Sequence, residues 1–437
     1  MSKKSAFLKG KFISTPSLRL SMLILMISFL NAPLIAQQQQ NKAKNMTAKE
    51  ILGNPDYLAI SFGGFRHTSR EIEPTIAELT EDLKILSAMG IKILRTYNVF
   101  YKEATNLLEA ITKLKSENPD FEMYLMLGAW IDCKHPRTDN PLHHEESELN
   151  ASEIERAVAL ANKYPDIVKV IAVGNEAMVK WAAAYYVEPY IILNWVNHLQ
   201  DLKKKGKLPA DLWITSSDNF ASWGGGGAEY HNDTLNQLIK SVDYISMHTY
   251  PMHDTHYNPQ FWAVPESENS LSDLEKIDAA MLRSLNYAKS QYESVVNYMR
   301  GLKINKPVHI GETGWATYSN EHYGNEGSRA ADQYKSGIYY KLIREWTKKA
   351  GIACFFFEAF DEPWKDAKNP QGSENHFGLI NTRSQAKYML WDEVDKGTFK
   401  GLTRGGKPIT QTFDGNLDSL LKFVKAPVSA QEIIIQH

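Results

Sequence analysis

The sequence predicts a single α/β domain folded as a (β/α)8 barrel, or TIM barrel, with inserted loops. Runs rich in β-branched and aromatic residues alternate with amphipathic segments, which is typical of parallel strands joined by helices. The runs are nearly continuous in apolar residues, as expected of strands that are covered on both faces. A doubly wound Rossmann-type sheet is the alternative, but no G-x-G-x-x-G sequence follows the first run.

The predicted strands are the runs 57–62, 91–97, 121–130, 168–173, 212–216, 242–248, 307–310 and 352–357. The clearest amphipathic helices between them are 75–89, 102–116, 152–163, 191–205, 271–299 and 329–349. The roughly 390 residues after Lys49 suit one barrel with long loops. We therefore assign 50–437 to a single barrel domain, because no linker in the sequence marks off a second one.

Residues 1–36 have the pattern of a secretory signal peptide. The segment contains five basic residues and no acidic one. The basic residues are Lys3, Lys4, Lys9, Lys11 and Arg19. An apolar run over 20–30 follows, and the small residue Ala36 precedes polar Gln37. A membrane anchor is the alternative, but it needs about 20 apolar residues. We expect cleavage near Ala36, a disordered polar leader over 37–49, and a secreted or periplasmic mature chain with no membrane span.

Composition limits the choice of partner. Removal of five positive charges and no negative ones takes the formal net charge from −2 to −7. Such a chain has no electrostatic basis for binding nucleic acid or anionic lipid, so a neutral partner and a monomer are expected. The two cysteines, Cys133 and Cys354, are too few for a disulfide framework. Buried thiols are the simpler interpretation, and a bridge between the two is the alternative.

Two glutamates follow predicted buried strands. Glu176 ends Val173-Gly174-Asn175-Glu176 after the fourth strand, and Glu312 lies in Ile310-Gly311-Glu312-Thr313-Gly314-Trp315 after the seventh. Catalytic residues of this fold sit at the carboxyl ends of its strands. Two carboxyl groups delivered to one cleft are what glycoside hydrolysis requires, one as proton donor and the other as nucleophile. A single strand-terminal acid would more often be a surface residue, so the pair carries the prediction.

These stretches resemble glycoside hydrolase family 17, the β-1,3-glucanase family of plants, fungi and bacteria. The resemblance spans roughly Tyr57 to Asn381. It is carried by the two glutamate motifs and by 357–365, with weaker matches at Leu94-Arg95-Thr96-Tyr97 and Thr249-Tyr250-Pro251. It implies a bacterial, secreted member in which Glu176 is the acid/base and Glu312 the nucleophile.

The resemblance also implies site roles for three residues after the eighth strand, namely Glu362, Lys365 and Glu374. The loop before Glu374 looks longer than in the plant enzymes. A solvated surface cation is the alternative for Lys365. Arg95 and Tyr97, from the weaker match at the second strand, are expected to bind substrate.

Three further expectations have a physical basis. Glu312 must be ionised and Glu176 protonated, and two nearby carboxyl groups favour this because the charge of one raises the pKa of the other. Asn175 is suited to bond the sugar 2-hydroxyl, although a turn residue is the alternative. Tyr250 could orient Glu312 through its hydroxyl, or it could be a core aromatic residue.

Aromatic residues crowd the predicted barrel mouth, at Tyr97, Trp130, Trp181, Trp223, Trp262, Trp315 and Trp364. Flat rings stack on sugar faces, and we single out Trp130 and Trp315 as substrate-binding. Trp223 precedes four glycines, which predicts a flexible loop. The histidines after the sixth strand, His248, His253 and His256, lack the spacing of a zinc protease and are interpreted as polar loop residues. No metal and no cofactor are expected.

Together these features predict a secreted, retaining endo-β-1,3-glucan hydrolase that acts on laminarin-type polysaccharide. A transglycosylase with the same catalytic pair is the first alternative, because water and an acceptor sugar compete for the same intermediate. A non-catalytic glucan-binding protein is the second, although binding alone requires neither a proton donor nor a nucleophile. An enzyme for another β-linked glucan or a mannan is the third.

Overall fold

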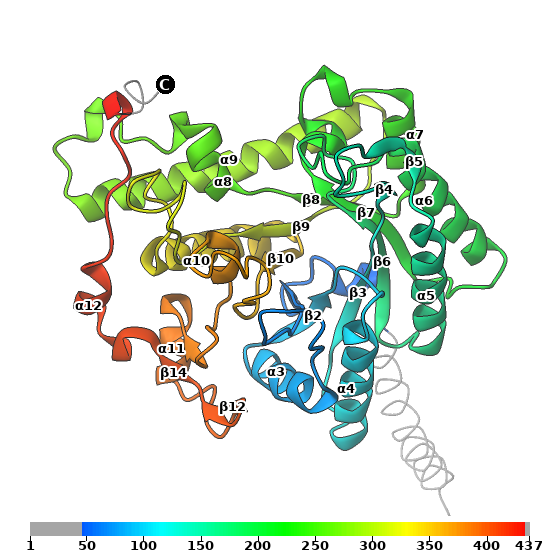
Figure 1. The fold of residues 1–437 in the computed structure, drawn as a ribbon, viewed down its shortest axis with the longest axis horizontal. Helices are drawn as coiled ribbons and strands as arrows, with labels where there is room; N and C mark the ends of the chain where they lie inside the picture. Colours follow the sequence, from blue (N-terminus) through cyan, green and yellow to red (C-terminus); the bar gives the residue numbers. More distant parts are fainter. Residues whose placement is uncertain (1–45, 433–437) are drawn as a thin grey trace, which may run out of the picture. The chain divides into compact units, whose positions relative to one another are not determined.

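The structure is a computed structural model that describes residues 46–432. Eight parallel strands close into a barrel in the order β1-β10-β9-β8-β7-β6-β3-β2 (Figure 1). They are β1 Leu58–Ser61, β2 Ile91–Arg95, β3 Tyr124–Ala129, β6 Val168–Asn175, β7 Trp213–Asn219, β8 Ile245–His248, β9 Val308–Gly314 and β10 Cys354–Phe357. Each overlaps a predicted strand, and the predicted (β/α)8 barrel is confirmed.

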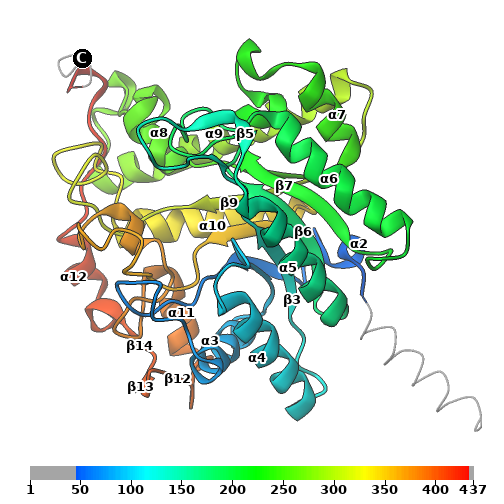
Figure 2. The same cartoon turned by 45° about the vertical axis from the view of Figure 1, so that its right-hand side comes forward.

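Helices alternate with these strands, as Figures 1 and 2 show. They are α3 Ile76–Ala88, α4 Glu103–Glu117, α5 Leu149–Lys163, α6 Pro189–Lys204, α7 Asp233–Ser241, α9 Asp273–Gly301 and α10 Gln333–Ala350. Helix α3 begins where Thr75 accepts a hydrogen bond from the Glu78 backbone while the Glu78 side chain bonds back to Thr75. Such a capping box satisfies two amide groups that the first turn leaves free. The helices bury their apolar faces in one continuous core.

Shorter elements complete the barrel unit, which begins at Thr47 and is described up to residue 432. They are α2 Ala48–Ile51, β4 Cys133–Lys134, β5 Leu142–Glu146, α8 Pro251–Tyr257, β11 Gln385–Ala386, α11 Trp391–Asp395, β12 Thr403–Arg404, β13 Lys407–Pro408, β14 Thr410–Gln411 and α12 Leu417–Leu421. The β12 segment is tied to α3 by Asp82, which is fully buried and paired with both Arg66 and Arg404. This contact fastens the C-terminal segment onto the barrel.

The predicted signal peptide lies outside the described residues, as does the leader up to residue 45. The leader was expected to extend to Lys49, but helix α2 already begins at Ala48, whose side chain is buried. Within residues 46–432, no helix combines the length and the apolar character that crossing a bilayer requires. Cys133 and Cys354 are both buried and carry free thiols.

Three of the aromatic residues expected at the barrel mouth belong to the core instead. Trp223, Trp262 and Trp315 are fully buried. Trp315 packs on the rings of Trp262 and Tyr339, and its indole nitrogen donates to the carbonyl of Ala330. The prediction that Trp315 binds substrate is therefore wrong, because the chain turns inward after β9 and buries the ring.

The glycine-rich stretch after Trp223 is packed rather than open. Gly224 has a φ of +89°, and a Cβ placed there would lie 2.2 Å from the ring of Tyr298. Trp223 donates its indole hydrogen to the carbonyl of Ser246. The glycines permit a close approach to α9 that a side chain would block.

Candidate active site

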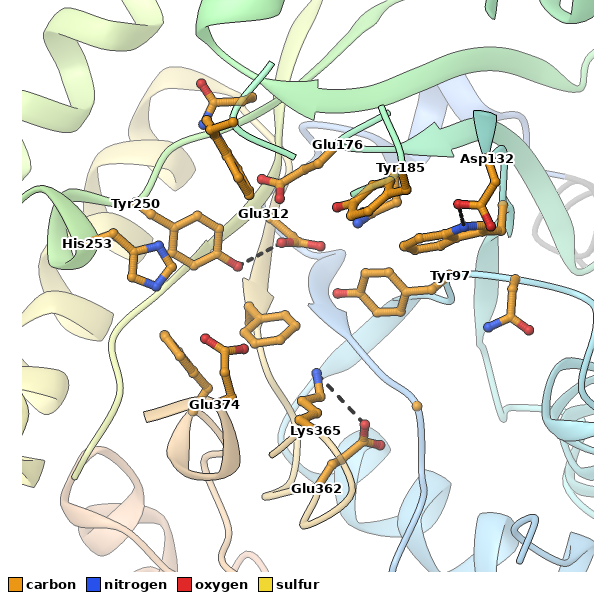
Figure 3. A pocket seen from close by; sticks show the side chains of 18 of the residues that line it. Tyr97, Asp132, Glu176, Tyr185, Tyr250, His253, Glu312, Glu362, Lys365 and Glu374 are labelled. Carbon is orange, nitrogen blue, oxygen red and sulfur yellow. Dashed lines mark hydrogen bonds and ion pairs between the residues drawn. The ribbon is translucent and has the colours of Figure 1, made fainter. Parts of the chain in front are cut away.

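The two glutamates meet at the mouth of the barrel (Figure 3). Glu176 directly follows β6, and Glu312 lies in β9. A carboxylate oxygen of each lies within 4.8 Å of the other and of a ring nitrogen of His248. Retaining glycosidases hold their carboxyl groups about 5–5.5 Å apart, whereas inverting enzymes need roughly 6.5–9.5 Å to admit a water molecule. The spacing suits direct attack on a sugar by one of the two groups.

Glu312 is held by donors on both oxygens. The Arg95 guanidinium bonds Oε1 at 2.5 Å, and the Tyr250 hydroxyl donates to Oε2 at 2.8 Å. Burial alone would raise the pKa of Glu312, but His248, Arg95 and the tyrosine hydroxyls outweigh it and lower the pKa to about 2. Glu312 is therefore ionised at neutral pH, and the expected hydrogen bond from Tyr250 is present.

Glu176 has the opposite environment. Burial raises its pKa well above the ordinary value, and the negative charge of Glu312 adds to this effect. His248 lies 3.0 Å from its Oε1, but burial lowers the pKa of His248 to about 4, so this ring is neutral at neutral pH. Glu176 also has a φ of +47°, a left-handed conformation that side chains seldom adopt and that is common at functional sites.

His248 is a site residue that the sequence interpretation missed. It ends β8, it is fully buried, and its Nε2 pairs with the hydroxyl of Ser217 at 2.8 Å. Ser217 in turn pairs with Ser246. Gly311 makes room for this chain, since a Cβ there would lie 2.2 Å from the Ser246 hydroxyl. In the sequence, the one sign of this role is that His248 is the last residue of a predicted strand.

Arg95 lies behind the site rather than in it. Its side chain is 1% exposed, and besides Glu312 it bonds the carbonyl of Gly311 and the side-chain oxygen of Asn175. Arg95 ends β2 and lies beneath the residues that line the cavity. The prediction that it binds substrate is therefore wrong. Because Asn175 accepts from Arg95 through its oxygen, its amide nitrogen is left to donate.

Glu176 and Glu312 line a cavity of about 1390 Å³. The other residues predicted to bind substrate that line it are Asn175, Tyr97, Trp130, Tyr250, Glu362, Lys365 and Glu374. Trp181 and Trp364 line it too, and Trp181 is 62% exposed. The walls therefore offer flat rings and hydrogen-bonding groups together, which suits a hydroxylated ligand.

Glu362 and Lys365 form a buried ionic cluster opposite β6. The Lys365 ammonium lies 2.9 Å from Glu358 and 3.9 Å from Glu362, so it is not a solvated surface cation. Burial raises the pKa of Glu358 well above its usual range, and Lys365 opposes that effect. Glu374 has a solvent-exposed side chain at the cavity wall. Desolvation by the surrounding protein raises its pKa, Lys365 opposes this effect, and the charge of Glu312 adds to it.

Around Trp130, the cavity wall near β6 also carries three residues that the sequence did not single out, Asp132, Arg137 and Tyr185. Trp130 packs against Tyr185, with 5.5 Å between ring centroids and 44° between the ring planes. Asp132 accepts from the Trp130 indole at 2.7 Å and pairs with Arg137 at 3.0 Å. These residues come from segments after β3 and β6, and only the fold brings them together.

The same three groups, Glu176, His248 and Glu312, are close enough to hold a metal ion. Their donor atoms already have other partners, however, in Arg95, Tyr250 and Ser217. The guanidinium beside Glu312 would also repel a second cation. The donor set fits proton transfer better than metal binding.

Comparison with known proteins agrees with this geometry. Residues 59–378 match the family model described as the BtgE/BtgC glycoside hydrolase domain. The chain is 64% identical to an endo-laminarinase from Formosa Hel1_33_131, whose crystal structure superposes with a TM-score of 0.87 over 88% of this chain and 98% of that chain. A glycoside hydrolase family 17 β-1,3-glucanosyltransferase from Rhizomucor miehei, 20% identical with a TM-score of 0.52, shares the fold over 75% of this chain and 94% of its own.

The curated relatives are more distant. A putative glucan endo-1,3-beta-glucosidase, btgC, of Aspergillus niger is 25% identical over 323 residues, 72% of this chain. The chain spans only 40% of that protein and 46% of the corresponding protein of Aspergillus terreus. The family model covers most of the barrel and both glutamates, and the chain therefore belongs to the BtgE/BtgC glycoside hydrolase domain family.

Proposed function

We propose that this glycoside hydrolase is an endo-acting, retaining β-1,3-glucanase that degrades laminarin-type polysaccharide. The carrying observation is the pair of adjacent glutamates whose pKa values are displaced in opposite directions. The 64% identity to an endo-laminarinase supports the choice of substrate. The proposal includes membership of glycoside hydrolase family 17, as a bacterial and secreted protein, on the motifs around Asn175 and Glu312.

The first chemical step follows from the protonation states. The Glu312 carboxylate attacks the anomeric carbon while the protonated Glu176 gives its proton to the departing glycosidic oxygen. The shorter sugar leaves, and the remaining glycone is bonded to Glu312 as an ester. Loss of the negative charge on Glu312 removes one cause of the raised pKa of Glu176, so Glu176 becomes a better base for the next step.

The second step reverses the first. Glu176, now ionised, takes a proton from a water molecule, and the oxygen of that water attacks the anomeric carbon and releases Glu312. Two inversions give net retention of the β configuration. Asn175 is placed to donate its amide hydrogen to the sugar 2-hydroxyl, because Arg95 occupies its oxygen.

The test compares laminarin, lichenan, cellulose and mannan as substrates, with the products followed by proton NMR. We expect laminarin to be cleaved fastest into a series of oligosaccharides, and the β anomer to accumulate before mutarotation. Release of the α anomer first would reject the mechanism, and preference for mannan or cellulose would reject the substrate. Longer products made from laminari-oligosaccharides would favour the transglycosylase alternative.

Export is part of the proposal. Its support is the charge and apolar pattern of 1–36. Expression of the whole chain in a secreting bacterial host should give a monomeric mature protein that begins near Gln37. An intact N-terminus in the membrane fraction would contradict this, as would a multimer in light scattering.

A further inference from the structure

The cavity has a second concentration of aromatic rings, at the end opposite Glu176. Phe65, Tyr101 and Trp364 line it, and the Phe65 ring lies 6.1 Å from Tyr101 and 6.0 Å from Trp364. They come from the segments after β1, β2 and β10. These strands are neighbours in the barrel, and β10 lies four positions from β6 in either direction around the eight strands.

Arg70 fills the space between these rings. Its guanidinium carbon lies 4.2 Å from the centroid of Trp364 and 4.9 Å from that of Tyr101. Cation–π contacts of this kind fix the plane of a guanidinium without using its N–H groups. Among residues 46–432, the Arg70 guanidinium makes no hydrogen bond and no ion pair, and it lines the cavity. Its N–H donors are therefore not occupied by the described protein and are available to a ligand in the cavity.

The rings that hold Arg70 are themselves fixed. Glu362 accepts from the Trp364 indole at 3.0 Å and from the Phe65 backbone at 3.1 Å. Gly63 leaves room for this carboxyl group, because a Cβ there would lie 2.5 Å from Glu362 Oε1 and would displace it. The buried carboxyl group of Glu362 thus fixes the Trp364 ring and the Phe65 backbone, and the Trp364 ring in turn holds Arg70.

Arg137 provides a contrast at the other end of the cavity. It also lies over two rings, those of Trp130 and Tyr185, but its guanidinium is paired with Asp132 at 3.0 Å. An ion pair of this kind occupies the donors that Arg70 leaves available. The comparison singles out Arg70 as the arginine that is held in place yet not neutralised.

We propose that Arg70, stacked between Tyr101 and Trp364, is a specificity-determining residue that donates hydrogen bonds to sugar hydroxyls on the glycone side of the cleaved bond. The inference rests on the proposed glucanase function. The proton donor must touch the oxygen that leaves with the aglycone, so the aglycone extends past β6 and Glu176. The glycone then extends toward β10, β1 and β2, where Arg70 lies.

The carboxyl groups on this wall leave Arg70 free to bind a neutral ligand. Glu103 and Glu362 line the same wall. Burial together with the charge of Glu362 raises the pKa of Glu103 well above its usual range, so Glu103 is protonated at neutral pH. The hydroxyl groups of an unmodified glucan can accept hydrogen bonds from the guanidinium.

The experiment measures kcat/KM for laminari-oligosaccharides from two to seven sugars, with the position of cleavage read from products labelled with ¹⁸O at the reducing end. The variants are Arg70→Met, which keeps roughly the length of the side chain, and Arg70→Lys, which keeps the charge but lacks the planar set of guanidinium N–H donors. Arg300→Met, an exposed arginine on α9 outside the cavity, is the matched control.

We expect the loss in Arg70→Met to grow with chain length and to reach roughly 10- to 100-fold, the usual effect of one hydrogen bond from a charged group. Cleavage should shift toward the non-reducing end, because the glycone-side contact is gone. Arg70→Lys should fall between Arg70→Met and the wild type, and Arg300→Met should match the wild type.

Three results would overturn the role of Arg70. They are an equal loss at every chain length, no loss at any length, and a shift of cleavage toward the reducing end. If Arg70→Met does not fold, as judged by its thermal midpoint, Arg70→Lys gives the same length dependence at smaller amplitude. Wild-type protein that leaves every β-1,3-linked oligosaccharide intact would instead reject the proposed function, and the role of Arg70 would fall with it.

Discussion

The carboxyl ends of β9 and β6 each present a glutamate to the same cavity, with opposite results. Glu312, on β9, receives a guanidinium and a phenol and has its pKa lowered to about 2. Glu176, after β6, faces a histidine that is neutral above about pH 4, and its pKa is raised. Burial acts in the same direction on both groups. The opposite pKa shifts therefore come from the partners that neighbouring strands supply to each carboxyl group, and not from how deeply each group is buried.

Removal of the carboxylate on the β9 side should have the largest effect. Glu312→Gln should lower kcat on laminarin by roughly 10⁴- to 10⁶-fold, because loss of a nucleophile has consequences of that order. Since the variant leaves Arg95 without its counter-charge, its thermal midpoint should be measured alongside. A folded variant that loses less than about 100-fold would show that Glu312 is not the nucleophile.

Substitution of Glu176, after β6, should have a smaller effect on turnover, and the size of that effect should depend on the substrate. Glu176→Gln should slow hydrolysis of laminarin by about 10²- to 10⁴-fold, the usual contribution of a general acid. Aryl glycosides with good leaving groups need little protonation, so their first step should be affected much less. Equal losses on both substrates would contradict the assignment of Glu176 as the acid.

The pH profile of kcat/KM tests the same assignment in the wild-type protein. Glu312 stays ionised down to about pH 2, and the raised pKa of Glu176 keeps it protonated well above the ordinary range of a carboxyl group. Activity should therefore fall on the alkaline side as Glu176 loses its proton. The two apparent pKa values of the profile belong to the coupled pair of carboxyl groups. With an activated aryl glycoside, Glu176→Gln should lack this alkaline limb.

A smaller change sharpens the role of the partners. Tyr250→Phe removes one donor to the Glu312 carboxylate while it keeps the ring. A hydrogen bond to a charged group contributes about 1.5–3 kcal/mol, so the pKa of Glu312 should rise and the acid limb of kcat/KM should move up by about one to two pH units. Arg300→Met serves as a control for substitution as such. An unmoved acid limb would show that Tyr250 does not stabilise the ionised form.

Two tryptophans that follow barrel strands should give the smallest effects on turnover, and of different kinds. Trp315→Ala should lower the free energy of unfolding by about 3–5 kcal/mol with little change in KM, because the ring is in the core. Trp130→Ala, at the cavity wall, should instead raise KM with a smaller loss of stability. Chemical denaturation and steady-state kinetics on laminarin measure both quantities. A changed KM for Trp315→Ala, with an unchanged KM for Trp130→Ala, would contradict the placement of Trp315 in the core.

The strand pattern was sufficient to predict the barrel and the two strands that deliver the glutamates. It could not separate Trp130, which lines the cavity, from Trp315, which does not, since both follow strand ends. The inward turn that buries Trp315 depends on contacts with Trp262 and Tyr339, which lie far away in sequence. Motif matching likewise located Arg95 without showing whether it lies at the rim or beneath it.

His248 and Arg70 were beyond prediction for a related reason. The meaning of His248 depends on Ser217 from β7 and Glu176 from β6, so it emerges only when three strands are placed side by side. Arg70 lies in an irregular segment with no periodic pattern, and its two rings come from separate loops. Local sequence carries little information on such contacts.

The backbone at Glu176 has a consequence for evolution and engineering. A left-handed conformation at a residue other than glycine or asparagine is a strain of about 1–3 kcal/mol that the surrounding fold must maintain. Glu176→Asn would relieve that strain and remove a buried carboxyl group, so the inactive protein should melt at a higher temperature than the active one. Selection for thermal robustness alone would therefore favour asparagine at this position, whereas the proposed proton donor requires glutamate.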